Sequence, residues 1–347
     1  MSTSKLFAEE PEKTGTQELL DRIETLEKDL KKLEGESKAR KSLEVTEDEK
    51  VKKEKDVLEA VGREYTLSHK GTLSIDYSLS YSYSPSEVFS AQQQATDAAL
   101  VLSANRQANH TIVHSIYTSY SILDNLTSSM SIPILYRYNK LGTTSSLTQT
   151  DLGDISFGLG TQIPSSWTWL RLPGEINNTY SFGCSLPTGR SPYKINPKTE
   201  LSTGSGTYGL SLGTSFSKQT DPVVLFWGLG YSYAFPLKNL NYRVQDTYTL
   251  EEVKSGGAYS FNMGMGYSLS YDTSINMSFS YGYAKSSTFT YKELAEPRET
   301  GDSVSASFGV GMGMTLTPKN SLSISLGYSL LSAGFSLSAR LPFNFVM

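Results

Sequence analysis

Few residues of this chain have the chemistry of a catalytic or metal-binding site. The histidines are His69, His110 and His114, and the last two have the spacing that places two metal ligands on one face of a helix. They lie, however, where apolar and polar residues alternate, which predicts a strand, and on a strand this spacing does not make a zinc pair. The single cysteine, Cys184, has no charged neighbour in the sequence that would make its thiol reactive. No histidine is placed to activate a serine or aspartate, so we expect neither an enzyme nor a bound metal or cofactor.

The residues best suited to act on a ligand are four isolated charges. Asp76, Arg137, Asp154 and Arg340 each occupy the phase of an alternating segment that otherwise carries mainly Ser and Gly. If the apolar phase meets lipid, a charge in that phase would cost about 2–4 kcal/mol near the bilayer midplane. We therefore expect all four on the opposite face, toward a lumen. There they either line a water-filled passage or form pairs that fix the register of the wall.

Strands must position these charges, and the alternation is clearest at the end of the chain. From Ser321 to Leu330, and again from Ala333 to Phe345, every second residue is apolar or aromatic. A period of two is that of a β-strand, and each run matches the roughly 9–11 residues that a tilted strand needs to cross a bilayer. The pattern recurs from Lys70 onward and predicts, over residues 70–347, an all-β transmembrane barrel of about twelve antiparallel strands. The expected strands are 70–84, 109–122, 126–138, 151–162, 175–187, 204–217, 222–235, 257–271, 273–285, 302–316, 320–330 and 333–346.

Long and short connections alternate between these strands, which is typical of outer-membrane barrels. Two connections depart from the rule: residues 163–174 form a long one where a turn is expected, and the one before Ala333 is very short. Ala91 to Leu100, within the first long loop, consists of good helix formers and is expected to be helical. A barrel of this width cannot be filled by Ser and Gly side chains, so an open or pluggable pore is expected.

The first 69 residues have a different pattern. Residues 1–35 contain an apolar seam with alternating spacings of four and three, which predicts a coiled-coil oligomerisation segment, as a trimer or a dimer, or else a solvated tether. The seam residues are Leu19, Ile23, Leu26, Leu30 and Leu33. Residues 36–69 form a charged linker that either connects the two parts or contains a short helix acting as a plug. The candidate plug residues are Val51, Val57, Leu58 and Val61.

The composition agrees with a barrel wall. The hydrophobic fraction is 38%, yet the chain has 22 Tyr and 28 Gly, which suits strands that face lipid and lumen in turn. A net charge of -4 argues against general nucleic-acid binding. Met1 to Glu10 carries no apolar segment of the signal-peptide type, so we expect a mature form from which the native signal peptide is missing.

Five short motifs resemble a large family of outer-membrane transporters, which includes the phenol-degradation proteins of the MetA pathway and the FapF-type exporters of functional-amyloid subunits. The motifs are Gly153-Asp154-Ile155, Ser185 to Tyr193, Ser202 to Gly206, Thr220 to Phe226, and Arg340 to Phe345. Together with the predicted coiled coil, they are most similar to the FapF type. That resemblance implies a trimer of twelve-stranded barrels in the bacterial outer membrane, a coiled coil in the periplasm, and a plug helix that gates the export of unfolded amyloid subunits.

Three functions remain open on the sequence. The first is a gated export channel whose partners are outer-membrane lipid, further copies of the chain and a secreted amyloid subunit polypeptide. The second is an uptake pore for small hydrophobic or aromatic compounds, which predicts a narrow, aromatic-lined constriction. The third is a soluble β-rich structural or adhesin domain, in which the aromatic stripes would face a dry core.

Overall fold

The computed structural model describes residues 70–93, 100–141, 145–163, 176–197, 199–220, 223–244, 248–270, 272–317 and 320–346. The expected coiled coil at residues 1–35 and the expected linker at residues 36–69, with the seam and plug residues, lie outside this part of the chain. Within the described residues, no helix has the length and apolarity to cross a membrane.

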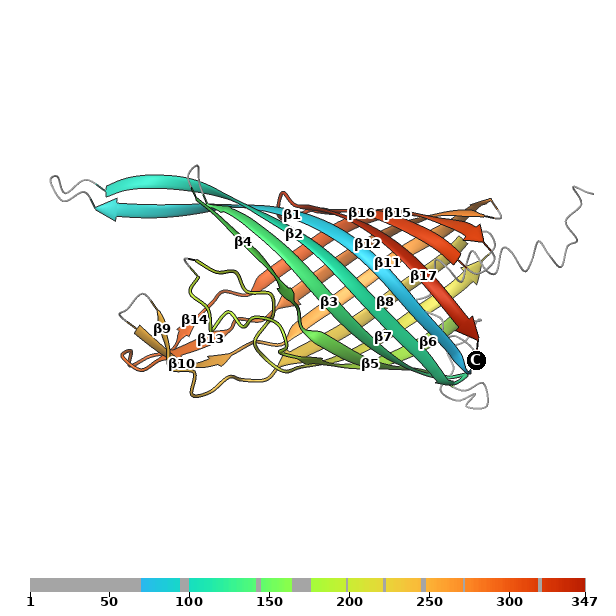
Figure 1. The fold of residues 1–347 in the computed structure, drawn as a ribbon, viewed down its shortest axis with the longest axis horizontal. Coiled ribbons are helices and arrows are strands. Elements are labelled where there is room, and N and C mark those ends of the chain that lie inside the picture. The colour runs from blue at the N-terminus through green and yellow to red at the C-terminus, as the bar shows by residue number, and fades with distance from the viewer. Residues whose placement is uncertain are drawn as a thin grey trace, which may run out of the picture. The chain divides into compact units, whose positions relative to one another are not determined.

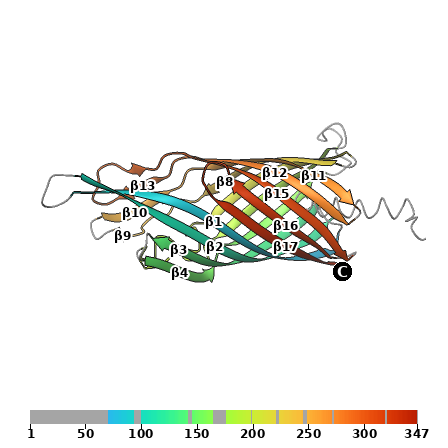
Figure 2. The ribbon, with the colours of Figure 1, turned by 90° about the horizontal axis from the view of Figure 1, so that it is seen from above.

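The described strands close into an antiparallel barrel (Figures 1 and 2). Its order runs from β2 through β1, β17, β16, β15, β12, β11, β8, β7, β6 and β5 to β3, and the pairing of β3 with β2 closes the ring. The barrel strands are β1 (Thr72–Gln93), β2 (Leu100–Leu123), β3 (Leu126–Leu141), β5 (Ile155–Gln162), β6 (Ile176–Leu186), β7 (Gly209–Thr220), β8 (Val223–Ala234), β11 (Ala258–Ser270), β12 (Thr273–Ala284), β15 (Ser303–Thr317), β16 (Asn320–Ser329) and β17 (Phe335–Val346). The sequence prediction of a twelve-stranded barrel is thus confirmed.

The strand called β4 (Ser145–Leu152) lies in line with β5 rather than beside it. Both pair with β3, β4 with its second half and β5 with its first half. Between them Gly153 and Asp154 interrupt the strand, and the Gly153 amide donates to the Pro133 carbonyl at 2.8 Å. A Cβ at Gly153 would lie 2.4 Å from a side-chain carbon of Leu135 and 2.9 Å from one of Pro133, so a larger residue here would force these side chains to shift.

The apolar phase of the alternation faces outward. Tyr77 and Leu79 are each 39% exposed, whereas Asp76, the residue before Tyr77, is 3% exposed. The same holds on the neighbouring strands β17 and β16, where Leu337 and Leu326 are among the exposed apolar side chains. Stripes of exposed aromatic and aliphatic residues on successive strands rule out the soluble alternative, in which these stripes would form a dry core.

At one end of the barrel the connections are long and fold into a second, four-stranded sheet. Its order is β14 (Arg298–Glu299), β13 (Thr288–Tyr291), β10 (Tyr248–Lys254) and β9 (Tyr242–Val244). Leu250 and Val253 of β10 are almost fully buried, so these connections have a small core of their own. Figure 1 shows this sheet at the end of the barrel away from the C-terminus; we call that end the loop end and the opposite one the turn end.

The connection between β1 and β2 differs from the prediction. Ala91 to Gln93 and Leu100, expected in a helix, lie in strands, since β1 and β2 stay paired up to Gln93 and Leu100. The ladder of a long hairpin has overridden the local helix propensity of these residues. The hairpin outruns its neighbours, because β17 pairs with β1 only as far as Tyr83 (Figure 1).

Candidate functional site

The inner face of the barrel encloses a cavity of about 470 Å³ next to the break between β4 and β5. Because inward positions on these strands carry Ser, Thr and Gly, the surface of the cavity is rich in hydroxyl groups. Its lining includes Tyr117, Ser129, Ser131, Ser156, Gly158, Gly183, Ser185, Ser205, Thr207, Ser211 and Ser232. Hydroxyl groups both donate and accept hydrogen bonds, so this surface can contact uncharged polar groups in many orientations.

Asp154 fastens a loop to this cavity. Its two carboxylate oxygens accept hydrogen bonds from the Gly189 amide at 3.0 Å, the Ser205 amide at 2.7 Å and the Ser205 hydroxyl at 2.6 Å. The bonds join the strand break to both arms of the connection between β6 and β7, residues 187–208. Since Ser205 and Thr207 belong to the cavity lining, Asp154 fixes part of the lining rather than facing an open lumen.

The same connection is held by further contacts, so we call residues 187–208 the anchored loop. The Thr188 hydroxyl donates to the Gly153 carbonyl at 2.7 Å, and the Thr203 hydroxyl donates to the Leu152 carbonyl at 2.8 Å. The Arg190 guanidinium contacts Asp151 at 2.9 Å and Glu200 at 3.2 Å. Because both arms bond to the strand break, β7 begins at Gly209 and not near residue 204 as the sequence suggested.

The anchored loop also contacts the four-stranded sheet. The Tyr242 hydroxyl of β9 donates to the carbonyl of Ile195, whose side chain is buried. Burial raises the pKa of Tyr193, in the same loop, above its ordinary 10.0. The loop-end structures therefore form one connected layer.

Charged groups elsewhere in this layer are fixed by hydrogen bonds. The Thr249 amide donates to the Glu293 carboxylate at 2.7 Å and lowers its pKa. The pKa of Asp302 is lowered by the Tyr283 hydroxyl, which donates to it at 2.5 Å, and by the Ser286 amide at 2.8 Å. Both carboxylates consequently stay ionised at neutral pH and accept from backbone donors of the loops.

Two of the four predicted charges contact each other. Arg340 of β17 donates to Asp76 of β1 at 2.6 Å, and the Ser74 hydroxyl donates to the same carboxylate at 3.3 Å. The guanidinium carbon of Arg340 lies 5.9 Å from the centre of the Tyr117 ring, within the range of a cation–π contact. This geometry matches the alternative in which the charges form pairs and fix register, here at the seam between the first and last strands.

Arg137 is not brought together with the other three charges. Its Nη1 donates to the Ser202 carbonyl in the anchored loop at 2.7 Å. Its Nε is buried and has no hydrogen-bond partner among the described residues. Arg137 and Asp154 thus both bind the anchored loop, each through its own hydrogen bonds.

An apolar patch that the sequence pattern did not predict lies on the inner face near the turn end. Val224 and Phe226 of β8 are 6% and 8% exposed and alternate with the outward Leu225, which is 42% exposed. The Phe226 ring lies over Gly264 of β11, where a Cβ would come within 2.4 Å of it. The signal was present in the sequence, since Val223 to Trp227 is apolar in both phases of the alternation.

No protein-family model matches the chain. Among solved structures, an outer membrane channel from Pseudomonas putida F1 is similar over 81% of this chain and 97% of its own, with a TM-score of 0.56 and 14% identity. The translocator domain of the autotransporter NalP from Neisseria meningitidis, with a TM-score of 0.43 and 11% identity, covers 84% of this chain and 93% of its own. The KdgM porin in complex with disordered oligogalacturonate, with a TM-score of 0.39 and 10% identity, covers 78% of this chain and 99% of its own. At such identities the first likeness shows the fold alone, a closed barrel like that of the channel, and the other two carry no argument.

Proposed function

We propose that this protein is an outer-membrane channel. The observation that carries the proposal is a closed barrel with two unlike faces, apolar outside and hydroxyl-rich inside, around a cavity of about 470 Å³. Such a wall satisfies its backbone hydrogen bonds within the sheet and presents hydrocarbon to lipid, which a bilayer requires of any spanning structure. The lumen is the passage, and the anchored loop is part of its lining.

Within that class we propose export of an unfolded polypeptide, such as an amyloid subunit, as the FapF-type motifs imply. Support comes from the way in which the lumenal charges are engaged by the protein itself. Asp76 is paired with Arg340, Asp154 accepts from the anchored loop, and Arg137 donates to a carbonyl of that loop. The surface that remains for a substrate carries many uncharged hydroxyl groups, which suit the amide groups of an extended chain.

The alternative, uptake of small hydrophobic or aromatic compounds, fits this cavity less well. That function needs a narrow passage lined by aromatic side chains, because apolar ligands are recognised mainly through apolar contact. The described lining includes the aromatic residues Tyr117, Phe157 and Tyr233, but Ser, Thr and Gly make up most of it. Release of an amyloid subunit from cells, compared with uptake of small aromatic compounds into proteoliposomes, distinguishes the two functions.

We further propose that the turn end is the gated end. Inward residues there are buried, among them Ser274 at 2%, Ser217 at 5% and the apolar Val224 and Phe226. The patch formed by Val224 and Phe226 would receive the plug residues Val51, Val57, Leu58 and Val61 as an apolar contact, since Lys70 starts the barrel at this same end. In this proposal the seam Leu19, Ile23, Leu26, Leu30 and Leu33 joins three copies on the periplasmic side.

The test is the conductance of the full chain in planar bilayers against that of a variant lacking residues 1–66. We expect the full chain to be largely closed and the shortened chain to open, because the plug is gone. Replacing Phe226 by Ser in the full chain should open it partly. Equal conductance of all three would remove the gate and leave the channel, while a shortened chain that carries no current would contradict the channel itself.

A further inference from the structure

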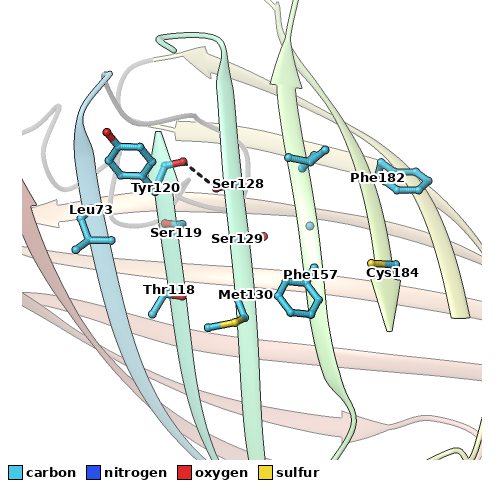
Figure 3. Close-up of a pocket in the computed structure, with 12 residues that line it drawn as sticks. Leu73, Thr118, Ser119, Tyr120, Ser128, Ser129, Met130, Phe157, Phe182 and Cys184 are labelled. Carbon is cyan, nitrogen blue, oxygen red and sulfur yellow. Dashed lines mark hydrogen bonds between the residues drawn. The ribbon is translucent and has the colours of Figure 1, made fainter. Parts of the chain in front are cut away.

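A groove of about 340 Å³ lies on the outer wall of the barrel, near the turn end (Figure 3). It crosses β2, β3, β5 and β6, where two rows of paired residues run around the barrel. One row is Tyr120, Ser128, Leu159 and Phe182, and the next is Thr118, Met130, Phe157 and Cys184. All eight residues line the groove, and its position on this face does not overlap the patch of Val224 and Phe226.

The groove exists because short side chains interrupt both rows. Ser128, Thr118 and Cys184 stand among long neighbours and leave the wall locally thin. The long neighbours form its rims: Phe157 is 42% exposed and Phe182 is 45% exposed. Figure 3 shows the rings of Phe157 and Phe182 on either side of the space above Cys184.

The two polar side chains near the centre of the groove, Ser128 and Cys184, make little demand on an occupant. The Ser128 hydroxyl donates to the Tyr120 carbonyl at 3.5 Å, a long contact that still directs its hydrogen toward the wall (Figure 3). A thiol is a weak hydrogen-bond donor and behaves as a small apolar group. An apolar occupant would therefore leave no strong donor of Ser128 or Cys184 pointing into it.

The size of the groove selects a thin occupant. At about 30 Å³ for a group of water size, the groove holds roughly ten such groups. A stable contact between two barrels would instead bury more than about 1,000 Å² over a broad surface, which a groove this small does not supply. One hydrocarbon chain fits the volume and can touch both rims at once. Lipid tails and apolar side chains are equally apolar, so burial alone would not hold a lipid chain in the groove. Van der Waals contact with both rims is what would hold the bound chain more tightly than the surrounding lipid is held.

We propose that this groove is a binding site for one acyl chain of a phospholipid in the leaflet around the turn end of the barrel. The proposal rests on the proposed membrane location. It assigns Ser128, Thr118 and Cys184 as the residues whose small size creates the site, and Phe157 and Phe182 as the walls that hold the chain. The lipid kept there is a structural ligand of the wall, separate from the substrate in the lumen.

The experiment uses the full chain in vesicles whose phospholipid carries a photoreactive diazirine in one acyl chain. After irradiation, mass spectrometry locates the cross-links. We expect them to concentrate on the peptides that contain Met130 and Cys184, several-fold above those on the opposite wall. Ser128→Phe, which fills the groove, should abolish the excess, and native mass spectrometry in mild detergent should show one phospholipid on the wild type and none on this variant.

Ala306→Phe on β15, far around the ring from the groove, is the matched control and should keep both signals. If Ser128→Phe does not assemble, Cys184→Leu replaces it. Cross-links spread evenly over the outward face, or lipid retained equally by all variants, would overturn the proposed acyl-chain site and leave the channel proposal standing. Outward residues without any cross-link would overturn both, because the wall would not be in lipid.

Discussion

Replacing Asp154 by Asn should release the anchored loop. The carboxylate accepts three hydrogen bonds, two from backbone amides and one from the Ser205 hydroxyl. An asparagine keeps one acceptor oxygen, and its NH₂ group would face a backbone N–H where a second acceptor is needed. The variant therefore loses at least one bond to a charged acceptor and leaves a donor unsatisfied.

The size of the effect follows from those bonds. A hydrogen bond to a charged group contributes about 1.5–3 kcal/mol, and an unsatisfied donor costs about 1–3 kcal/mol when buried. Asp154 is only partly buried, so we take about 2–4 kcal/mol for the substitution as a whole. At about 1.4 kcal/mol for each factor of ten, the population of the released loop should rise roughly 30-fold to 700-fold. The Thr188 and Thr203 contacts, which the substitution leaves in place, would bring the result toward the lower end.

Limited trypsin digestion of the assembled barrel measures this population. Arg190 and Lys194 lie in the anchored loop, and cleavage of a transiently opened segment follows the open population when closing is fast. We expect cleavage after these residues to accelerate by at least tenfold in Asp154→Asn. Asp302→Asn is the control, because it removes a carboxylate from another loop-end connection. A change of less than threefold in Asp154→Asn, or an equal acceleration in both variants, would refute the anchoring role.

Three further predictions concern the junction between β1 and β17, the inner patch of Val224 and Phe226, and the loop-end sheet. Asp76→Asn should lower the free energy of unfolding by about 1.5–3 kcal/mol, because the bond from the Arg340 guanidinium to a charged acceptor is lost. Asp76→Asn combined with Arg340→Met should recover part of this loss, as read from the temperature at which the barrel unfolds on a gel. Gly264→Ala should destabilise the barrel by about 1–3 kcal/mol, since its Cβ would overlap both the Phe226 ring and the backbone carbonyl of Met277. Phe226→Leu should relieve only part of the loss in the same assay, because the overlap with the carbonyl remains. The lowered pKa of Glu293 means that its contact with the β10 amide stabilises the sheet above the ordinary pKa of 4.5 and is lost as the pH falls below it. The protection of that amide, measured as its hydrogen-exchange rate relative to the intrinsic rate at the same pH, should fall under acid in the wild type, whereas Glu293→Gln should show no such step.

The sequence predicted the barrel well because the wall obeys one local rule. Every strand must put apolar groups outward, so alternation located all the barrel strands. The outward direction of Leu326 or Tyr77 could therefore be assigned without knowing which strands pair with theirs. Where a longer-range contact decided the structure, the prediction failed. The Ala91–Leu100 segment has the composition of a helix, but its ends are paired strands.

The candidate site was predictable only in part. Asp154 was identified as an inward charge, but nothing near it in the sequence indicates Ser205, its partner 51 positions away. The pairing of Asp76 with Arg340 likewise depends on how the ring closes. The inward position of Phe226 was not predicted because Val223 to Trp227 is apolar at successive positions. In such a run, alternation cannot show which side chains point inward and which point outward. The expected seam and plug residues stay predictions, since they lie outside the described residues.

The seam between β1 and β17 has a consequence for how the barrel can form. Thr72 pairs with Val346, and the Arg340–Asp76 ion pair joins residues 264 positions apart. Until the last strand is in place, β1 and β16 each expose an unpaired edge, which can join to the edge of another chain. Closure is therefore the final event of assembly and depends on the most distant contacts in the molecule, which are the slowest to form. A nascent chain that lacks only β17 would already contain eleven strands, yet it would be an aggregation hazard and not a nearly complete pore.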